Sequence, residues 1–481
     1  MRRLAAAIAA VLLLVGCGTT GRQPPDPPAP DPLSWITCPE AVEVQFVSRH
    51  ECGWLSVPQA STDSSGPVAK LLLLKVWPVG RDPGDDVGTS LGHDYGSPIP
   101  LGGDIAAGAT RGGGVVVQLS LRGSATYAEP SLACPETDQI RTAGLADRDA
   151  STRATFVAAI DTCARRLRAA GVEPANFDAA ATAADAEQLR TSLGVEQWSS
   201  LGTYGTSSST MLTYLATYPG TAKLAFLDSP ASPDLDPLTA GVVGLDSALA
   251  ALDRAHPGLE RTWKQALKTT RDRPLRGSSH GVRVVVDDAK LLRLVRFSLG
   301  GDGPGNVRYV PAILADAAAG KLHPHLADLA AKDPAFCAGY IPLCAPNFSL
   351  GLFLTNFCQQ LPADTAALDA AIAGRPAYQQ VFADSPYWDA CRAWNVPAKP
   401  RPVLTDPGMP ILVLTGEYDS FSRPEWAEAW VRRLGGQARS YSLPGQTHNV
   451  LGSSKCAHVI RADWRQHPSK PPDASCAQPT R

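Results

Sequence analysis

The chain has 481 residues, and 44% of them are hydrophobic, so it is long and apolar enough to bury a large core. Its formal net charge is only −2, which gives no reason to expect a nucleic-acid partner. Its 42 prolines and 42 glycines are typical of an exported protein rich in loops, and the hydrophobic content argues against a disordered chain.

The N-terminus has the pattern of an export signal. Two arginines precede an apolar run over residues 4–15, and that run is too short for an ordinary membrane-spanning helix. The segment Leu14-Val15-Gly16-Cys17 resembles a bacterial lipobox. We therefore predict a signal peptide over residues 1–16 and a lipid such as palmitate on Cys17, which anchors the protein to the extracytoplasmic side of the cell membrane. The alternative is an ordinary secretory signal with a cysteine at its end by chance.

A proline-rich stretch follows the predicted lipidation site. Residues 17–37 contain six prolines and few side chains that could be buried. We expect this stretch to be an extended tether that holds the folded part away from the membrane.

The cysteine count supports export. Ten of the 11 cysteines remain when Cys17 is set aside, and an even number beyond a signal peptide is typical of disulfides formed in an oxidising compartment. A zinc site is the alternative, but no C-x-x-C motif and no histidine at ligand spacing accompany these cysteines, so no metal is expected. We expect sequence neighbours to pair: Cys38 with Cys52, Cys134 with Cys163, Cys337 with Cys344, Cys358 with Cys391, and Cys456 with Cys476.

Residues 38–233 alternate between strand and helix patterns. Residues 70–77 and 115–119 are apolar runs typical of buried strands, whereas residues 152–169 and 185–193 have helical patterns. Such alternation favours a mainly parallel sheet with both faces covered. We therefore predict the α/β class, with the N-terminal part of the core in this region.

The alternation stops after residue 233. Residues 234–400 are predicted to be helical and rich in loops, whereas an apolar strand pattern at Pro410 indicates that the sheet resumes within residues 401–481. An insertion of this size is typical of a cap or lid, which would shape access to a site at the carboxyl ends of the strands. The alternative is a structural elaboration with no role in the site.

The segment Leu201-Gly202-Thr203-Tyr204-Gly205-Thr206 resembles the G-x-S-x-G turn of a hydrolase, with threonine in place of serine. Residues 197–201 before it can form a short strand, and residues 206–218 after it carry apolar side chains at helical spacing. A strand, a tight turn and a helix are the context in which this motif lifts its nucleophile above the sheet. Thr203 is therefore the candidate nucleophile.

Two later segments supply candidates for an acid and a base. Residues 410–419 form an apolar strand pattern that ends in Asp419, and residues 443–448 form a strand pattern followed by a loop with His448. The order nucleophile, acid, base along the chain is that of an α/β-hydrolase triad. The alternatives are a helix N-cap for Asp419, an ordinary surface position for His448, and Asp228 as a substitute acid at the end of another strand.

Five stretches combine into one pattern: residues 51–58, residues 121–124 with 134–136, residues 201–228, residues 416–419, and the segment around His448. Together they resemble the secreted α/β-hydrolase peptidases of the tripeptidyl aminopeptidase group, relatives of proline iminopeptidase that are common as exported bacterial lipoproteins. The resemblance implies an α/β-hydrolase fold with a helical cap inserted before the acid-bearing strand. It also implies a triad of Thr203, Asp419 and His448, removal of short peptides from free N-termini, and no cofactor.

The chain departs from that family's pattern at three points. Thr203 stands where serine is usual, and Leu201 stands where the first glycine of the motif is usual. The glycine-rich loop that supplies an oxyanion-hole amide has only partial counterparts, of which Gly92 is our candidate. The N–H of Tyr204, which follows the nucleophile position, would be the second oxyanion donor.

Two functions are therefore predicted as alternatives. In the first, the protein is a membrane-anchored hydrolase of peptide bonds, like an aminopeptidase or tripeptidyl peptidase, or of small esters. Thr203 would attack the substrate, His448 would act as general base, and Asp419 would orient that base. In the second, the protein is a catalytically impaired family member that binds peptides or a protein partner. The retained acid and base favour activity, whereas Thr203 and the missing glycines favour binding.

Overall fold

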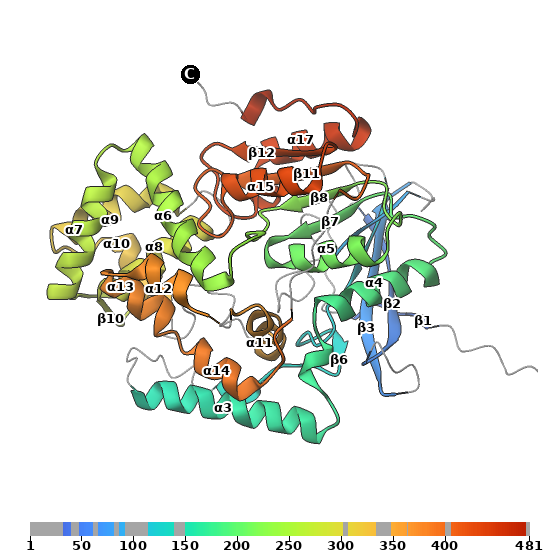
Figure 1. The fold of residues 1–481 in the computed structure, drawn as a ribbon, viewed down its shortest axis with the longest axis horizontal. Helices are drawn as coiled ribbons and strands as arrows, with labels where there is room; N and C mark the ends of the chain where they lie inside the picture. Colours follow the sequence, from blue (N-terminus) through green and yellow to red (C-terminus); the bar gives the residue numbers. More distant parts are fainter. Residues whose placement is uncertain are drawn as a thin grey trace, which may run out of the picture. The chain divides into compact units, whose positions relative to one another are not determined.

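Ten strands of the described residues form one sheet (Figure 1). Their order is β1-β2-β3-β5-β4-β7-β8-β11-β12, with β6 paired to β3. Pairing is antiparallel from β1 to β5 and parallel from β5 through β4 to β12. The strands are β1 (Leu33–Ile36), β2 (Ser48–Pro58), β3 (Val68–Pro78), β4 (Val87–Ser90), β5 (Val115–Leu119), β6 (Ala128–Glu129), β7 (Leu201–Tyr204), β8 (Ala225–Asp228), β11 (Ile411–Gly416) and β12 (Ala438–Leu443). This crossed order, with helices between the parallel strands, is the α/β-hydrolase fold, and it confirms the predicted fold class.

The computed structural model describes residues 32–39, 48–60, 66–80, 86–91, 114–138, 150–301, 306–332, 348–362, 364–399 and 406–477. The predicted signal peptide, the lipidation site Cys17 and the oxyanion candidate Gly92 lie outside these ranges. Residues 33–36, which were predicted to belong to the tether, instead form β1 and pair with β2. Leu33 is buried there against the sheet.

Helices cover both faces of the sheet: α4 (Ala179–Ser192), α5 (Ser208–Thr217) and α15 (Pro424–Leu434) on one face, and α17 (Lys455–Gln466) on the other. Successive side chains of a strand point to opposite faces, so each buried strand contributes side chains to the hydrophobic cores on both faces of the sheet. Ile411 and Val413 of β11 lie in the cluster with α4, α5 and α15. Leu412 and Leu414 lie in the cluster with α17. Burial on both faces explains the continuous apolar runs of the parallel strands.

The chain between β8 and β11 contains most of the other helices. They are α6 (Pro237–Ala255), α7 (Leu259–Asp272), α8 (Asp288–Gly300), α9 (Val310–Ala318), α10 (Pro324–Lys332), α11 (Leu350–Gln359), α12 (Ala366–Ile372), α13 (Pro376–Tyr378) and α14 (Tyr387–Trp394), with a hairpin of β9 (Leu275–Ser279) and β10 (Val282–Val286). Helices α6 to α10 share a hydrophobic core with α12 and α13. Helices α11 and α14 instead pack on α3 (Ala150–Ala169), which precedes β7 in the chain (Figure 1). Residues 234–400 thus contribute to two separate cores.

A buried ion pair connects the loop after β5 to α4. The guanidinium of Arg122 donates to both carboxylate oxygens of Asp185, with 2.7 Å between Nε and Oδ2. It also donates to the carbonyl oxygens of Gln59 and Asn176, each at 2.9 Å. The two charged side chains are 1% and 2% exposed. Arg122 therefore braces three segments that are distant in the sequence.

Four disulfides join described cysteines: Cys38 to Cys52, Cys134 to Cys163, Cys358 to Cys391, and Cys456 to Cys476. All four agree with the expected pairing of sequence neighbours, which is thereby confirmed for these cysteines. The fifth predicted pair, Cys337 with Cys344, lies outside the described residues. Disulfides in this number are typical of a protein that folds in an oxidising compartment.

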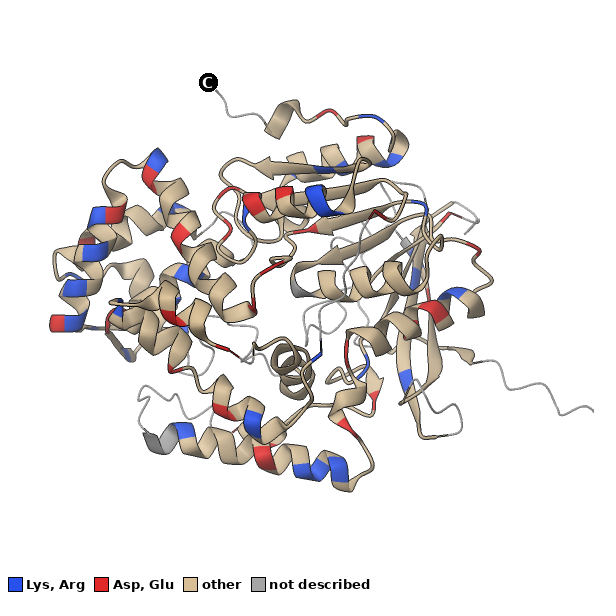
Figure 2. Ribbon diagram, viewed as in Figure 1, with Lys and Arg blue, Asp and Glu red and all other residues tan. Residues whose placement is uncertain are grey.

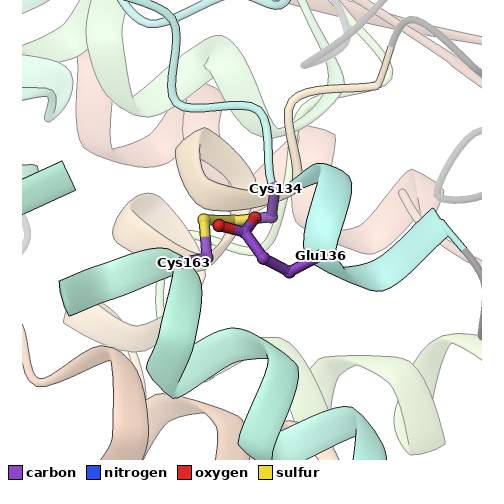
Figure 3. Close-up of side chains that lie close together, drawn as sticks. All are labelled: Cys134, Glu136 and Cys163. Carbon is purple, nitrogen blue, oxygen red and sulfur yellow. A yellow bond between two sulfur atoms is a disulfide. The ribbon is translucent and has the colours of Figure 1, made fainter. Parts of the chain in front are cut away.

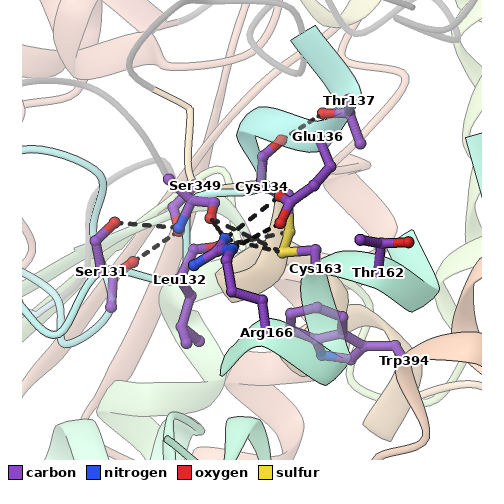
Figure 4. The surroundings of a disulfide bond; sticks show 12 residues. Ser131, Leu132, Cys134, Glu136, Thr137, Thr162, Cys163, Arg166, Ser349 and Trp394 are labelled. Atoms are coloured by element: carbon purple, nitrogen blue, oxygen red, sulfur yellow. Dashed lines mark hydrogen bonds and ion pairs between the residues drawn. A yellow bond between two sulfur atoms is a disulfide. The ribbon is translucent and has the colours of Figure 1, made fainter. Parts of the chain in front are cut away.

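One disulfide lies in a cluster of metal-ligand atoms. Cys134, Glu136 and Cys163 bring such atoms within 4.8 Å of one another (Figure 3). The two sulfur atoms are bonded to each other, so neither is a thiolate that could bind a metal ion. Glu136 is engaged by Arg166, whose Nε donates to Oε1 at 2.6 Å and whose Nη2 donates to the carbonyl oxygen of Ala133 at 2.9 Å (Figure 4). The cluster is a structural joint between α3 and the segment before it.

Charged side chains of both signs are mixed along the outer helices, as α7 illustrates (Figure 2). On α7, Lys264 pairs with Glu260 and Lys268 pairs with Asp272, each at 2.8 Å and one helical turn apart. This mixing agrees with the small net charge of the chain. Within the ranges that the structure describes, no helix is both long and apolar enough to cross a membrane.

Candidate functional site

The turn between strand and helix lies at Gly205. Strand β7 ends at Tyr204, a single 3-10 turn covers Gly205–Ser207, and α5 begins at Ser208. Gly205 has a φ of +56°, a left-handed conformation that glycine adopts at little cost. A nucleophile elbow is a sharp, strained turn at this point of the fold. The elbow is therefore two residues later than the sequence analysis predicted.

Gly205 faces the ring of His448. A Cβ atom built on Gly205 would lie 3.5 Å from Nε2 of His448. Among the described residues, no other atom beyond the adjoining chain lies within 4 Å of that point. A hydroxyl attached to such a Cβ would be within hydrogen-bond reach of Nε2. The position that a serine nucleophile would occupy is thus held by a residue without a side chain.

Thr203, the predicted nucleophile, lies inside β7. Thr203 pairs with Leu227 of β8, and the residue is 2% exposed. The Thr203 hydroxyl donates to the carbonyl oxygen of Leu91 at 3.0 Å, across the gap to β4. The β-branched side chain of Thr203 is favourable in a strand, whereas the left-handed conformation at the turn is favourable for Gly205. These preferences explain why the strand includes Thr203 and the turn falls at Gly205.

This placement gives a first prediction, on Thr203. Thr203→Val keeps the shape of the side chain but removes the hydroxyl, so the Leu91 carbonyl loses its bond. We expect the free energy of unfolding to fall by about 1 kcal/mol. Thr203→Ser keeps the bond and serves as the control. Urea unfolding of both variants checks this, and an unchanged stability of Thr203→Val would contradict the structural role.

Asp419 and His448 are in contact, as the sequence predicted. Nδ1 of His448 lies 2.7 Å from Oδ2 of Asp419, and the two residues are 7% and 1% exposed. The other carboxylate oxygen of Asp419 accepts the N–H groups of Phe421 at 2.7 Å and Ser422 at 2.9 Å. The loop after β11 thereby fixes the carboxylate, and the carboxylate fixes the orientation of the imidazole.

Two aromatic rings flank His448. The ring of Phe421 meets it edge-on with 5.4 Å between centroids, and the ring of Tyr204 lies at 5.1 Å. Tyr204 is the last residue of β7, and its side chain is its contribution to the surroundings of His448. With the elbow at Gly205, the N–H that follows the nucleophile position belongs to Thr206, in the 3-10 turn that precedes α5. In this register the N–H of Thr206, and not that of Tyr204, is the candidate oxyanion donor.

Asp228 holds the turn that follows His448. Its carboxylate accepts the N–H groups of Val450 at 3.1 Å and Leu451 at 2.8 Å, and the hydroxyl of Ser229 at 2.9 Å. Burial raises the pKa of this carboxyl to about 6, although those hydrogen bonds oppose the rise. Asp228 is thus a positioning residue, because it is Asp419 that contacts the His448 ring.

The raised pKa of Asp228 makes a pH prediction. The folded state binds the proton of Asp228 more tightly than the unfolded state does. The protonated carboxyl therefore adds to the free energy of unfolding below pH 4, and this contribution is lost as the pH rises through about 6. Asp228→Asn is uncharged at every pH. We expect the stability of the natural protein relative to this variant to fall by about 2 kcal/mol between pH 4 and pH 7. Urea unfolding across this range measures it, and a constant difference would contradict the assignment.

Comparisons with known proteins give one family match and several distant structural similarities. Residues 375–476, which include Asp419 and His448, match a family model described as TAP-like protein. A search of the curated proteins finds no match. The proline iminopeptidase of Mycobacterium smegmatis has 13% identity and a TM-score of 0.41, over 86% of this chain and 98% of that chain. A thermophilic esterase from Thermogutta terrifontis has 13% identity and a TM-score of 0.36, over 87% and 99%.

The fold and the contact between Asp419 and His448 make this a protein of the α/β-hydrolase class. Its C-terminal part is similar to TAP-like proteins, and a proline iminopeptidase and an esterase are among the solved structures that it resembles.

The sequence analysis missed the role of Gly205. The signal was present: a glycine stands between the strand pattern and the helical pattern, where a positive φ is needed. Because Thr203 carries a hydroxyl, the sequence analysis assigned the nucleophile position to it, two residues before Gly205.

Proposed function

We propose that this protein is an exported, lipid-anchored member of the α/β-hydrolase class that binds peptides or related acyl compounds without cleaving them through an acyl-enzyme. The observation that carries the proposal is Gly205 at the position facing Nε2 of His448. Covalent catalysis of this kind needs an attached hydroxyl beside the base, and glycine has none. The hydroxyl of Thr203 is bonded within the sheet instead.

The remaining parts of the site are suited to binding. Asp419 holds the imidazole of His448 in one orientation, with Nε2 directed to the space beside Gly205. The N–H of Thr206 lies in the 3-10 turn just before α5, and the N-terminal end of a helix favours partial negative charge. A carbonyl oxygen of a ligand placed beside Gly205 could accept from the N–H of Thr206, and an N–H or O–H group of the same ligand could donate to Nε2 of His448. Recognition of an acyl group is thereby retained without the group that attacks it.

Export and anchoring are supported by two features. The N-terminal pattern predicts a cleaved signal over residues 1–16 and a lipid on Cys17. The four disulfides of the described residues agree with folding outside a reducing cytoplasm. A protein held at the outer face of the membrane would meet extracellular peptides and small acyl compounds.

The test combines turnover with binding. The purified protein is assayed on p-nitrophenyl esters and on aminoacyl and tripeptidyl chromogenic substrates, and calorimetry measures its binding of short peptides. We expect peptide binding, and no turnover above a His448→Ala control. Turnover that is lost in Thr203→Ala would instead support a threonine hydrolase. Turnover that survives in Thr203→Ala but is lost in His448→Ala would show a base acting on water, and it would also overturn the proposal.

A further inference from the structure

Arg296 is a cation placed between aromatic rings. It lies on α8, with its Cζ atom 4.5 Å from the ring centroid of Phe421 and 5.5 Å from that of Phe382. Gly241 of α6 leaves room for it, because a Cβ atom there would lie 3.2 Å from Nη2 of Arg296. The guanidinium therefore lies within cation–π distance of two aromatic rings.

No acidic side chain of the described residues forms an ion pair with Arg296. Its Nε atom is buried and has no hydrogen-bond partner within the described part of the chain. Burial without a nearby carboxylate lowers the pKa of this group to about 10. Arg296 as a whole is partly exposed, and a cation that loses part of its hydration without a partner is costly to the folded state. Such a cost is typical of positions kept for a ligand.

Arg296 has a fixed position near the His448 pair. The centroids of the Phe421 and His448 rings are 5.4 Å apart, so Cζ of Arg296 is no more than about 10 Å from the centre of the imidazole. The loop that carries Asp419 is also tied to α8. The hydroxyl of Ser420 donates to the carbonyl oxygen of Arg296 at 3.0 Å, and the N–H of Ser420 donates to that of Leu299 at 3.2 Å.

We propose that Arg296 binds a carboxylate of the ligand whose acyl group lies beside Gly205 and His448. The inference rests on the proposed function and adds the chemical class: a short peptide, or a similar acyl compound, with a carboxylate in addition to its recognised carbonyl. A guanidinium matches a carboxylate with two parallel hydrogen bonds. The carboxylate can be the C-terminus of the peptide or the side chain of an acidic residue.

Three peptides separate these sources in calorimetric titrations: Ala-Ala-Ala with a free C-terminus, the same peptide as its C-terminal amide, and Ala-Glu-Ala amide. We expect the free acid to bind on the order of ten to a hundred times more tightly than the plain amide. Binding of the glutamate peptide more tightly than the free acid would assign the contact to an acidic side chain, and binding at the level of the plain amide would assign it to the C-terminus.

Variants of Arg296 decide whether this residue is the cause. Arg296→Gln is expected to abolish the preference for the acid, Arg296→Lys to retain part of it, and Arg276→Gln, at an exposed arginine of β9, to leave it unchanged. Thermal unfolding verifies that each variant is folded. Equal binding of all three peptides by the natural protein, or an unaltered preference in Arg296→Gln, would overturn the inference and leave the proposed function standing. Absence of binding by every peptide would overturn both.

Discussion

Gly205→Ser is expected to give the protein an esterase activity that its natural sequence lacks. The new side chain would start from a Cβ 3.5 Å from Nε2 of His448, so its hydroxyl can donate to a base that Asp419 already orients. A positioned general base contributes about a hundredfold or more to such reactions. We therefore expect hydrolysis of p-nitrophenyl esters at least about a hundredfold above that of the natural protein.

Matched variants separate this effect from nonspecific hydrolysis. Gly205→Ala adds the Cβ without the hydroxyl, and it should stay inactive. The double variant Gly205→Ser with His448→Ala should lose the gained activity. Both single variants at Gly205 place a side chain at positive φ, which costs about 1–2 kcal/mol of stability. An inactive but folded Gly205→Ser would contradict the placement of the elbow.

Arg122→Met is expected to cause the largest loss of stability among the single substitutions considered. It leaves the carboxylate of Asp185 buried at 2% exposure without its partner, and it removes the donor to the carbonyl oxygens of Gln59 and Asn176. Breaking a buried pair in this way costs about 3–5 kcal/mol. The measurement is the free energy of unfolding in urea.

A surface pair provides the control for Arg122. Arg165 pairs with Asp161 at 2.9 Å on α3, and both side chains are at least half exposed. Arg165→Met should therefore cost less than about 1 kcal/mol. A loss for Arg122→Met no greater than that for Arg165→Met would show that the buried pair is not the brace that its geometry implies.

Much of the fold follows from local patterns in the sequence. The apolar run at residues 115–119 is strand β5, and the helical pattern at residues 152–169 lies within α3. Alternating burial of a strand and spacing along a helix are determined by neighbouring residues, so they can be recognised without the tertiary structure. The contact of Asp419 with His448 was also predictable, because the ends of parallel strands meet at one edge of a sheet.

The register of the elbow could not be read in the same way. A motif with a hydroxyl at Thr203 and a motif with a glycine at Gly205 differ by two residues, so both place their residue on the same side of a strand. The choice depends on where β7 stops pairing with β8, and that pairing is tertiary. The strand continues through Tyr204, and only then can the chain take a positive φ.

Contacts between segments that are distant in the chain could not be predicted from the sequence either. Helices α11 and α14 lie in the region predicted as a cap, but they share a core with α3 because side-chain packing decides the partner. Arg296 gives no signal in the sequence, since nothing local distinguishes it from a surface arginine. Its place between Phe421 and Phe382 comes from the joining of α8 with two segments far along the chain.

The central claim is that Gly205 occupies the nucleophile position, and covalent labelling tests it most directly. The natural protein and Gly205→Ser are incubated with a fluorophosphonate, which reacts with activated hydroxyls, and peptide mass spectrometry locates the adduct. We expect no adduct on the natural protein and one adduct at position 205 of the variant. An adduct on Thr203 of the natural protein would contradict the account.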